Sequence, residues 1–508
     1  MNARRWTILG LLAAFAFGTW IRFAGIASLS LWYDEGFTAW AVDHPPTEII
    51  RIIRNDTAPP LYYLLLHGWT LAFGRSETGL RSLSAVLGVA TIPLIAAIAN
   101  LTLKKPAAVV AATWLFALSF AQIWYSQEAR AYELTAFWMA LMLLSLLRHI
   151  QRPSQINLVL LTLSVIGAAY THNIMLLYIA AVGAAGLAFP SPVNLRRKLR
   201  DMTIVTFCLI ASYLPWIGAL RSQVHRVNSN FWLPPPTFNS VCALLARICG
   251  VAHYWAWDRF IHVLYRDTAV GLPHTVVAAL LLGLVLIVMR LRGNDRRTAI
   301  ALAIATLGAP LAAIIESVIN RPILLPAAVL PSTVVFPVLA AGALVWTTHR
   351  KSRMLARAFV AIILLATAAT LGGYEIERTK EDWRGAAATV AAMPPAAARW
   401  IIFVDNDSEH PFDYYYQTRP NEVEKWIGPN DLAELRNKLA SGLLNDVVLI
   451  NAHAGWIDPG GDLHAGFSDP DALITRTILS YMQIAERIDL PADPSRHEIT
   501  IYHCVRRD

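Results

Sequence analysis

The chain has 508 residues, of which 56% are hydrophobic and 15% are charged, and its mean hydropathy is +0.45. An ordinary globular protein carries about 25% charged residues, so this composition excludes a set of soluble domains and also a disordered chain. The net charge of +8 combines 30 basic and 13 acidic residues in 1–373 with 13 and 22 in 374–508. The basic residues stand between apolar runs rather than on one folded surface, which argues against nucleic-acid binding and indicates a polytopic α-helical membrane protein.

Apolar runs recur along the first 373 residues, and about 20 helical residues are needed to cross a bilayer. They predict about 11 transmembrane helices, near residues 6–27, 82–103, 107–125, 131–148, 157–172, 174–189, 202–220, 271–290, 298–318, 323–346 and 354–373. The two runs on either side of His172 are short, and they form either two helices or one bent hairpin.

Clusters of Lys and Arg occupy the N-terminus, at residues 4–5, and every second connection between these helices, near residues 104–105, 148–152, 196–200, 290–297 and 350–357. Because basic connections remain in the cytoplasm, the N-terminus is predicted to be cytoplasmic. Eleven crossings then place the acidic tail outside. We therefore expect a multi-pass protein of the bacterial inner membrane, with its active site and tail in the periplasm.

Three long segments lie outside the predicted helices. The outer loop 28–81 contains an apolar run of about 14 residues, too short to cross, which predicts an interfacial or re-entrant helix at 61–74. The outer loop 221–270 is rich in aromatic residues. The tail predicts helices at 381–393 and 431–443 and strands at 400–404, 446–450 and 497–505. We expect a transmembrane catalytic domain over 1–373 and a soluble extracytoplasmic α/β domain over 374–508.

The four cysteines show neither a disulfide pattern nor a metal-binding spacing, so free thiols are expected. Carboxylates give a stronger signal, because the acidic residues of 1–373 fall on the predicted outer side, apart from Asp201 and Asp295. Asp34 and Glu35 stand among aromatic residues in LSLWYDEGFTAWAV, directly after the first apolar run. They either complement a helix N-terminus beside interfacial aromatics or take part in catalysis or donor binding.

Two further outer segments carry charged residues. Glu128 and Arg130 lie in YSQEARAYEL, where they form a surface ion pair or belong to a site. Arg321 is a lone outer-side arginine that snorkelling alone explains or that binds an anion.

The order of these segments resembles a known family. LWYDEGFT, the segment from Asp56 to Gly88, YSQEARAYEL and KEDWRGAAATVAA resemble the polyprenyl-phosphate-sugar-dependent glycosyltransferases of the GT-C fold. Within that fold, the chain is similar to the bacterial branch related to protein O-mannosyltransferases, lipid A aminoarabinose transferase and rhizobial galacturonosyltransferases. The resemblance covers residues 6–390. At Arg321 the branch often has an Arg-Tyr pair, whereas Pro322 follows here.

The resemblance implies transfer of a sugar from a polyprenyl-phosphate donor to an acceptor hydroxyl of an envelope glycan, lipid or protein, with inversion. Outer loops 28–81, 125–131 and 221–270 would form the active site. The family's position for the general base corresponds to Asp34, and Glu128 would be the second catalytic carboxylate. Substrate- and phosphate-binding positions fall on Glu35, Tyr62, His67, Arg81, Arg130, Tyr132 and Arg321.

Some roles stay open on the sequence. His67 and His172 suit packing or hydrogen bonding better than ligand binding. Glu35 binds either sugar hydroxyls or, together with Asp34, a divalent cation, and no other cofactor is expected. The expected partners are membrane lipids, the polyprenyl-phosphate-linked sugar and the acceptor, with no nucleic acid.

Two other functions compete with the enzyme. A transporter or flippase of lipid-linked sugars would carry polar residues at mid-membrane depth and often a repeated half. Mid-span charges are nearly absent here and no repeat is visible, so the outer carboxylates favour an enzyme. A scaffold acting through the acidic tail would leave those carboxylates unexplained.

Overall fold

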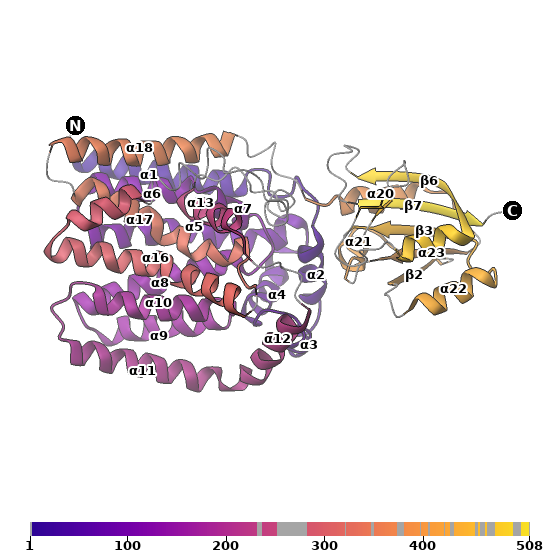
Figure 1. Ribbon diagram of the computed structural model, residues 1–508, viewed down its shortest axis with the longest axis horizontal. Helices are drawn as coiled ribbons and strands as arrows, with labels where there is room; N and C mark the ends of the chain where they lie inside the picture. Colours follow the sequence, from indigo (N-terminus) through magenta and orange to yellow (C-terminus); the bar gives the residue numbers. More distant parts are fainter. Residues whose placement is uncertain are drawn as a thin grey trace. The chain divides into compact units, whose positions relative to one another are not determined.

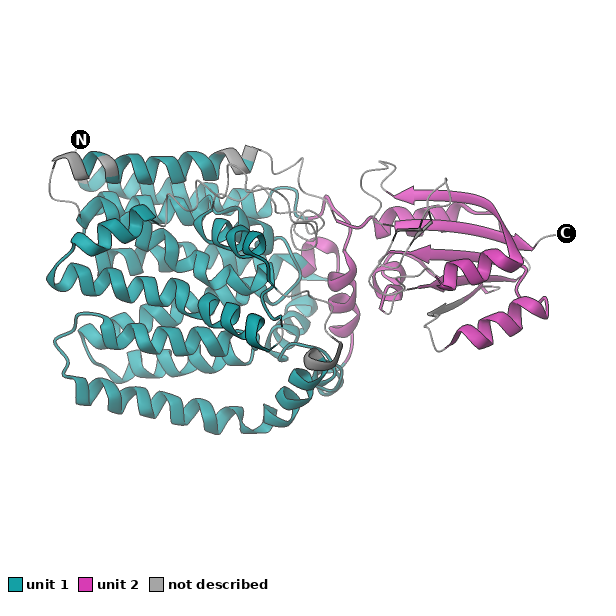
Figure 2. Ribbon diagram, viewed as in Figure 1, with its two compact units in different colours: residues 1–26, 45–74, 81–378 teal, residues 27–44, 75–80, 379–508 magenta. Residues whose placement is uncertain are grey.

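The structure is a computed structural model that describes residues 3–230, 236–250, 282–320, 322–346, 350–372, 380–396, 398–404, 407–420, 422–426, 431–452, 456–457, 463–464, 473–490 and 499–506. Its residues fall into two compact units (Figure 2). We call residues 1–26, 45–74 and 81–378 the helical unit, and residues 27–44, 75–80 and 379–508 the mixed unit. Two pieces of the first outer loop thus belong to the same unit as the tail.

The helical unit is a bundle whose described elements are helices (Figure 1). In chain order they are α1 (Ala3–Phe23), α3 (Pro46–Arg54), α4 (Leu61–Phe73), α5 (Glu77–Leu103), α6 (Pro106–Ala117), α7 (Phe120–Ser126), α8 (Tyr132–Gln151), α9 (Gln155–Ala169), α10 (Met175–Ala188), α11 (Leu195–Tyr213), α12 (Ile217–Asn230), α13 (Phe238–Cys249), α16 (Gly293–Ile319), α17 (Leu330–Trp346) and α18 (Arg350–Gly372). The first four residues of α5 belong to the mixed unit.

Membrane-spanning length is reached by six described helices, over residues 4–23, 77–103, 132–151, 195–226, 293–319 and 326–346. A seventh span is obtained if α6 and α7, which meet at a bend of 50°, are taken together. The chain is therefore a multi-pass membrane protein, but the predicted count of eleven is not confirmed. The runs on either side of His172 form two separate short helices, α9 and α10, and the run at 61–74 forms the short helix α4.

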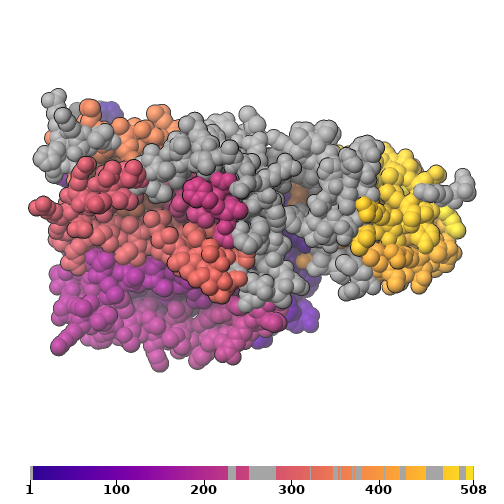
Figure 3. All heavy atoms as spheres, viewed as in Figure 1, coloured from indigo at the N-terminus to yellow at the C-terminus, as the bar shows by residue number. Residues whose placement is uncertain are grey.

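Burial separates the inner helix from the outer ones. α17 is apolar around its whole circumference, and 89% of its apolar stretch is buried among neighbours that include α6, α8, α16 and α18. In α1 only 17% of that stretch is buried, and in the segment 195–226 only 22%. Trp6, Trp20 and Phe207 are exposed apolar side chains of these helices. Figure 3 shows α11, in purple to magenta, on the outer surface of the unit. Lipid is the solvent that such surfaces require.

The mixed unit contains a five-stranded sheet with the strand order β2-β1-β3-β7-β6. Its strands are β1 (Arg399–Phe403), β2 (Glu422–Trp426), β3 (Asp446–Asn451), β6 (Met482–Leu490) and β7 (Ile499–Arg506), with a separate pair of β4 (Trp456–Ile457) and β5 (Leu463–His464). β1 pairs in parallel with β2 and β3, whereas β7 runs antiparallel to β3 and β6.

Both faces of the sheet are covered, because alternate strand residues point to opposite sides. On one face Ile402 and Leu449 join a core with α22 (Leu432–Ala440) and α23 (Leu473–Tyr481). On the other face Ile401 and Val448 join a core with α20 (Trp383–Ala392) and α21 (Glu409–Asp413). The predicted α/β domain and its two helices and three strands are confirmed. β2 and β6 were not predicted.

Candidate active site

The segment with the paired carboxylates forms helix α2 (Tyr33–Ala41), which belongs to the mixed unit. Asp34 and Glu35 both lie in its first turn, and Trp32 at the N-cap position makes no side-chain cap. Consecutive helical residues point about 100° apart, so the two carboxylates face different surroundings. Asp34 is half-buried, whereas the side chain of Glu35 is 0% exposed.

Segment 380–384 of the tail binds the start of α2. Lys380 Nζ lies 2.9 Å from Glu35 Oε2, in an ion pair whose lysine is only 7% exposed. Glu381 Oε2 accepts hydrogen bonds from the backbone N–H of Tyr33 at 3.0 Å and from Trp383 Nε1 at 2.7 Å. The carboxylate predicted to contact sugar or metal is thus already neutralised by a lysine 345 residues away.

The chain before α2 is held by a second set of contacts in the same unit. The N–H of Leu31 donates to Tyr415 Oη at 2.8 Å, and that hydroxyl donates to Glu77 Oε1 at 2.9 Å. Burial raises the pKa of Tyr415 well above its usual value, so the hydroxyl keeps the proton that it donates. Arg384 Nη2 also binds Glu77 Oε1, at 2.6 Å, and Ser30 Oγ donates to the carbonyl of Glu381 at 2.5 Å.

The middle of α2 packs closely on α21. A Cβ added to Gly36 would lie 2.5 Å from backbone and side-chain atoms of Pro411, so only glycine fits at this crossing. Trp40, one turn further on, stacks on His410 with ring centroids 4.2 Å apart and an interplanar angle of 14°. Helix α2 is therefore fixed along most of its length by the tail.

The helical unit contains the predicted site residues between α7 and α8. Gln127 Nε2 lies 2.9–3.3 Å from the carbonyls of Ile21, Arg22 and Ala24, and so caps the C-terminal end of α1. Glu128 is 3% exposed, and its Oε1 accepts a hydrogen bond of 2.6 Å from Trp124 Nε1. These contacts give loop 127–131 a defined position relative to α1 and α7.

Arg130 is the half-buried cation of this loop. Its Nη1 donates to Tyr63 Oη at 3.2 Å, and that hydroxyl donates to Asp56 Oδ2 at 3.3 Å. The guanidinium carbon lies 5.7 Å from the ring centroid of Tyr132. Burial and the charge of Arg130 lower the pKa of His172 to about 4, so this ring is neutral at pH 7.

Other predicted residues occupy inner positions of the helical unit. Tyr62 is fully buried and its Oη lies 3.0 Å from Ser84 Oγ. Arg81 is 0% exposed, and its Nη1 donates to the carbonyl of Ile26 at 2.8 Å. His67 is half-buried on α4. Arg321 lies outside the described residues, as do parts of the predicted active-site loop 221–270.

Charges that were not predicted for the site also lie in this unit. Arg247 is a buried cation on the apolar helix α13, and it interacts with the hydroxyl of Tyr125. The Tyr125 ring lies 5.1 Å from that of Tyr132, which is also the ring beside Arg130. The two arginines thus contact one aromatic pair. A lone arginine in the apolar run FNSVCALLARIC was the signal in the sequence.

A second buried group surrounds Gly88 of α5. A Cβ there would lie within 3.0 Å of Ser126 Oγ, Glu133 Oε1 and Arg22 Nε, so these three buried polar side chains meet at the glycine. Burying a charge is costly, and the electrostatic attraction between Arg22 and Glu133 offsets part of that cost. The group joins α1, α5, α7 and α8.

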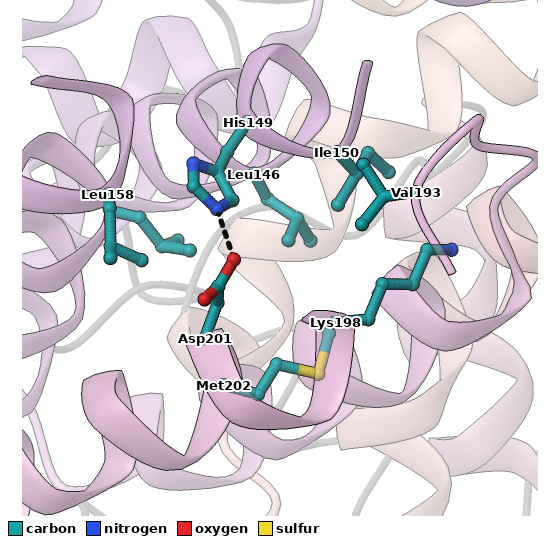
Figure 4. Close-up of a pocket in the computed structure, with 9 residues that line it drawn as sticks. Leu146, His149, Ile150, Leu158, Val193, Lys198, Asp201 and Met202 are labelled. Atoms are coloured by element: carbon teal, nitrogen blue, oxygen red, sulfur yellow. Dashed lines mark hydrogen bonds and ion pairs between the residues drawn. The ribbon is translucent and has the colours of Figure 1, made fainter. Parts of the chain in front are cut away.

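The far end of α8 carries a separate small pocket (Figure 4). His149 Nε2 lies 2.9 Å from Asp201 Oδ2, and Arg200 Nη2 lies 2.8 Å from Asp201 Oδ1. Lys198 Nζ donates to the carbonyls of Gly186 and Phe189. These contacts join α8, α10 and α11, which accounts for Asp201 as a structural residue.

A divalent cation was an open prediction at Asp34 and Glu35. Within the described ranges, no three His, Cys, Asp or Glu side chains group in a way that would hold a metal ion. Lys380 Nζ stands where a cation bound to Glu35 Oε2 would have to stand. The residues present at Glu35 therefore do not fit a resident cation. The four cysteines are free, as expected.

Comparison with known proteins supports the fold rather than a family assignment. No family model matches the chain, and no curated protein matches it. Two structures of ArnT from Cupriavidus metallidurans, apo and bound to undecaprenyl phosphate, superpose with TM-scores of 0.55 and 0.54 at 12% identity, covering 99% of this chain and 98% of theirs. The archaeal oligosaccharyltransferase AglB from Archaeoglobus fulgidus, in complex with an inhibitory peptide and a dolichol-phosphate, superposes with a TM-score of 0.53 at 13% identity. That match covers 96% of this chain and 80% of AglB. The chain is thus a multi-pass membrane protein with the GT-C fold.

Proposed function

We propose that this protein is an integral-membrane glycosyltransferase that moves a sugar from a polyprenyl-phosphate donor to an acceptor hydroxyl. The observation that carries the proposal is the fold, which the chain shares over nearly its whole length with ArnT and AglB. Structures of those two proteins contain undecaprenyl phosphate and a dolichol-phosphate, respectively. The acceptor would belong to an envelope glycan, a lipid or a protein, on the periplasmic side of the inner membrane.

Arg130 is our principal candidate for the donor phosphate. A planar guanidinium binds two phosphate oxygens at once, which suits a lipid phosphate better than a point charge does. Arg130 is half-buried and is oriented by Tyr63 and Tyr132, so little side-chain freedom would be lost on binding. Arg247 adds a second positive charge beside Tyr125. Arg81 and Arg321 stay predictions for the same role.

Asp34 is our candidate for the general base. A phosphate leaves as a stable anion, so its departure does not need a general acid. The acceptor hydroxyl is a poor nucleophile at neutral pH and needs a base to take its proton. Its oxygen would bond to the anomeric carbon as the bond from that carbon to the phosphate oxygen breaks, which inverts the configuration. Asp34 is half-buried at the start of α2, so its carboxylate is not wholly enclosed. Glu128 is the alternative base.

Binding of undecaprenyl phosphate to the purified protein tests the donor site, for example by native mass spectrometry. Hydrogen bonds to charged groups contribute about 1.5–3 kcal/mol, so Arg130→Ala should weaken binding roughly 10- to 100-fold. Arg130→Lys should retain part of the affinity, because it keeps the charge but not the planar fork. Arg247→Gln should weaken binding less.

Arg197→Ala is the matched control, because Arg197 is an exposed arginine near the other end of the bundle. It should bind as the unaltered protein does. Equal affinity of Arg130→Ala and Arg197→Ala, with both variants folded, would remove Arg130 from the donor site.

A further inference from the structure

We propose that Lys380 and Glu381 are positioning residues for catalysis, which hold α2 so that Asp34 stays in its working orientation. The inference rests on the proposed function, because it gives Asp34 the role of base. It assigns Glu35 as the buried counter-ion of Lys380 rather than as a ligand of sugar or metal. It also gives the tail an indirect part in the chemistry, because the tail would act through the position of α2.

The first support is the Lys380–Glu35 ion pair. Its atoms lie 2.9 Å apart, and neither side chain is more than 7% exposed. Removing one partner of a buried pair leaves an uncompensated charge, so the pair strongly favours the conformation in which both partners meet. Glu35 directly follows Asp34 in the first turn of α2. Because helix geometry is fixed, holding Glu35 in one place also fixes the direction in which the Cα–Cβ bond of Asp34 points.

The second support is the N-terminus of α2. The first backbone N–H groups of a helix have no partner inside it, and a carboxylate there is favoured by the helix dipole. Trp32 supplies no side-chain cap, and the Glu381 carboxylate accepts the N–H of Tyr33 instead. Trp383 Nε1 holds that carboxylate in place at 2.7 Å. Glu381 therefore acts as a cap supplied from 348 residues away.

The third support is that the contacts lie on both sides of Asp34 in sequence. Leu31 and Tyr33 are held before it, and Glu35 and Gly36 are held after it. All the partners come from residues 380–415. Asp34 itself is left half-buried in the middle of this fixed segment. Such a pattern fixes the backbone on both sides of the proposed base.

Turnover and donor KM of the purified protein separate positioning from mere folding. A small misplacement of a catalytic group costs up to about 10²-fold in rate, so Lys380→Met should lower kcat by about this order with donor KM little changed. Lys380→Arg should recover most of kcat. In the double variant Glu35→Gln/Lys380→Met no buried charge is left over, so its Tm should exceed that of Lys380→Met while kcat stays low.

Lys438→Met is the matched control. Lys438 pairs with Glu434 at 2.7 Å in a partly exposed contact of α22, remote in sequence from α2. This variant should keep the kcat of the unaltered protein. Equal kcat in Lys380→Met and Lys438→Met, with Asp34→Asn inactive, would overturn the positioning role and leave the proposed function intact.

Hydrogen exchange gives a readout that does not depend on activity. The N–H of Tyr33 donates to Glu381, so Glu381→Ala should speed amide exchange in peptides spanning 31–41, and Lys438→Met should not. Unchanged exchange in Glu381→Ala would overturn the positioning role, whatever the reaction is. Faster exchange together with full turnover of Asp34→Asn would instead keep the docking of α2 and remove the proposed base.

Discussion

Asp34 and Glu35 follow one another in the chain, yet their carboxylates meet different chemistry. The side chain of Glu35 is buried and forms an ion pair with Lys380. This pair neutralises the buried charge and leaves no room for a ligand on Glu35 Oε2. Asp34 is half-buried and lies in the same turn. A general base needs a fixed backbone and an accessible carboxylate, and among the predicted carboxylates Asp34 meets both conditions best.

The arginines divide in a similar way. Arg81 is wholly buried and donates to a backbone carbonyl inside the bundle. Arg130 is half-buried and rests on aromatic side chains, which is the setting in which a guanidinium is held ready for an incoming anion. The sequence presented these residues as equivalent outer-side arginines. Burial distinguishes them.

Gly36 offers a direct test of how tightly α2 is docked. A Cβ at this position would lie 2.5 Å from Pro411, so Gly36→Ala should destabilise the protein by about 1–3 kcal/mol, as overpacking does. Gly68→Ala is the matched control, because nothing lies within 4 Å of a Cβ there and alanine is the better helix former. Thermal unfolding in detergent should show a lower Tm for Gly36→Ala alone. A Tm equal to that of Gly68→Ala would mean that α2 is not packed on α21.

At the scale of elements, strong periodic or apolar patterns predicted the structure well. The tail strands at 400–404 and 446–450 were predicted because they read as nearly continuous apolar runs, and the strand at 497–505 because apolar and polar residues alternate along HEITIYHCV. All three are inner strands of the sheet. β2 and β6 were missed because they are the two edges of the sheet, where charged residues alternate with apolar ones as in EVEKW and AERID. The short helix α4 followed from run length alone, whereas run length left two helices or one bent hairpin open for the segments that form α9 and α10.

The contacts of the candidate site were harder to foresee. Asp34, Glu128 and Arg130 stood out because charge among outer aromatic residues is unusual. The partners Lys380, Glu381 and Tyr415 lie more than 300 residues away, and no local pattern encodes such a pairing. In the sequence, KEDWR stands out as the start of a predicted tail helix and by its resemblance to a family segment. The structure supplies the physical reason for that segment, since Lys380 and Glu381 bind α2.

For the whole molecule, the distribution of apolar and polar side chains agrees with the membrane protein that the composition indicates. Apolar side chains cover the outer helices, and polar groups collect at the helix ends, as in the pocket of His149 and Asp201 or in loop 127–131. The transmembrane orientation itself was inferred from six basic clusters. It decides whether the proposed chemistry takes place in the periplasm.

Cysteine labelling tests that orientation. Leu443→Cys lies at an exposed position of the tail, and Asn294→Cys lies at an exposed position of a basic cluster. An impermeant thiol reagent applied to intact spheroplasts should label position 443 and not position 294, because basic connections stay in the cytoplasm. Permeabilised cells provide the control, since both positions should then react. The opposite pattern in intact spheroplasts would move the proposed active site to the cytoplasmic face.

The central claim is that the chain transfers a sugar from a polyprenyl-phosphate donor with Asp34 as the base. The most direct measurement follows transfer of a labelled sugar from such a donor to an envelope acceptor by the purified protein and by Asp34→Asn. Asparagine keeps the size of the side chain but cannot take the proton, and base catalysis typically contributes about 10²- to 10⁴-fold. We therefore predict a fall in turnover of this order, with donor binding nearly unchanged. Near-normal turnover in Asp34→Asn would contradict the assignment of the base, and donor binding without any transfer by the unaltered protein would indicate a transporter instead.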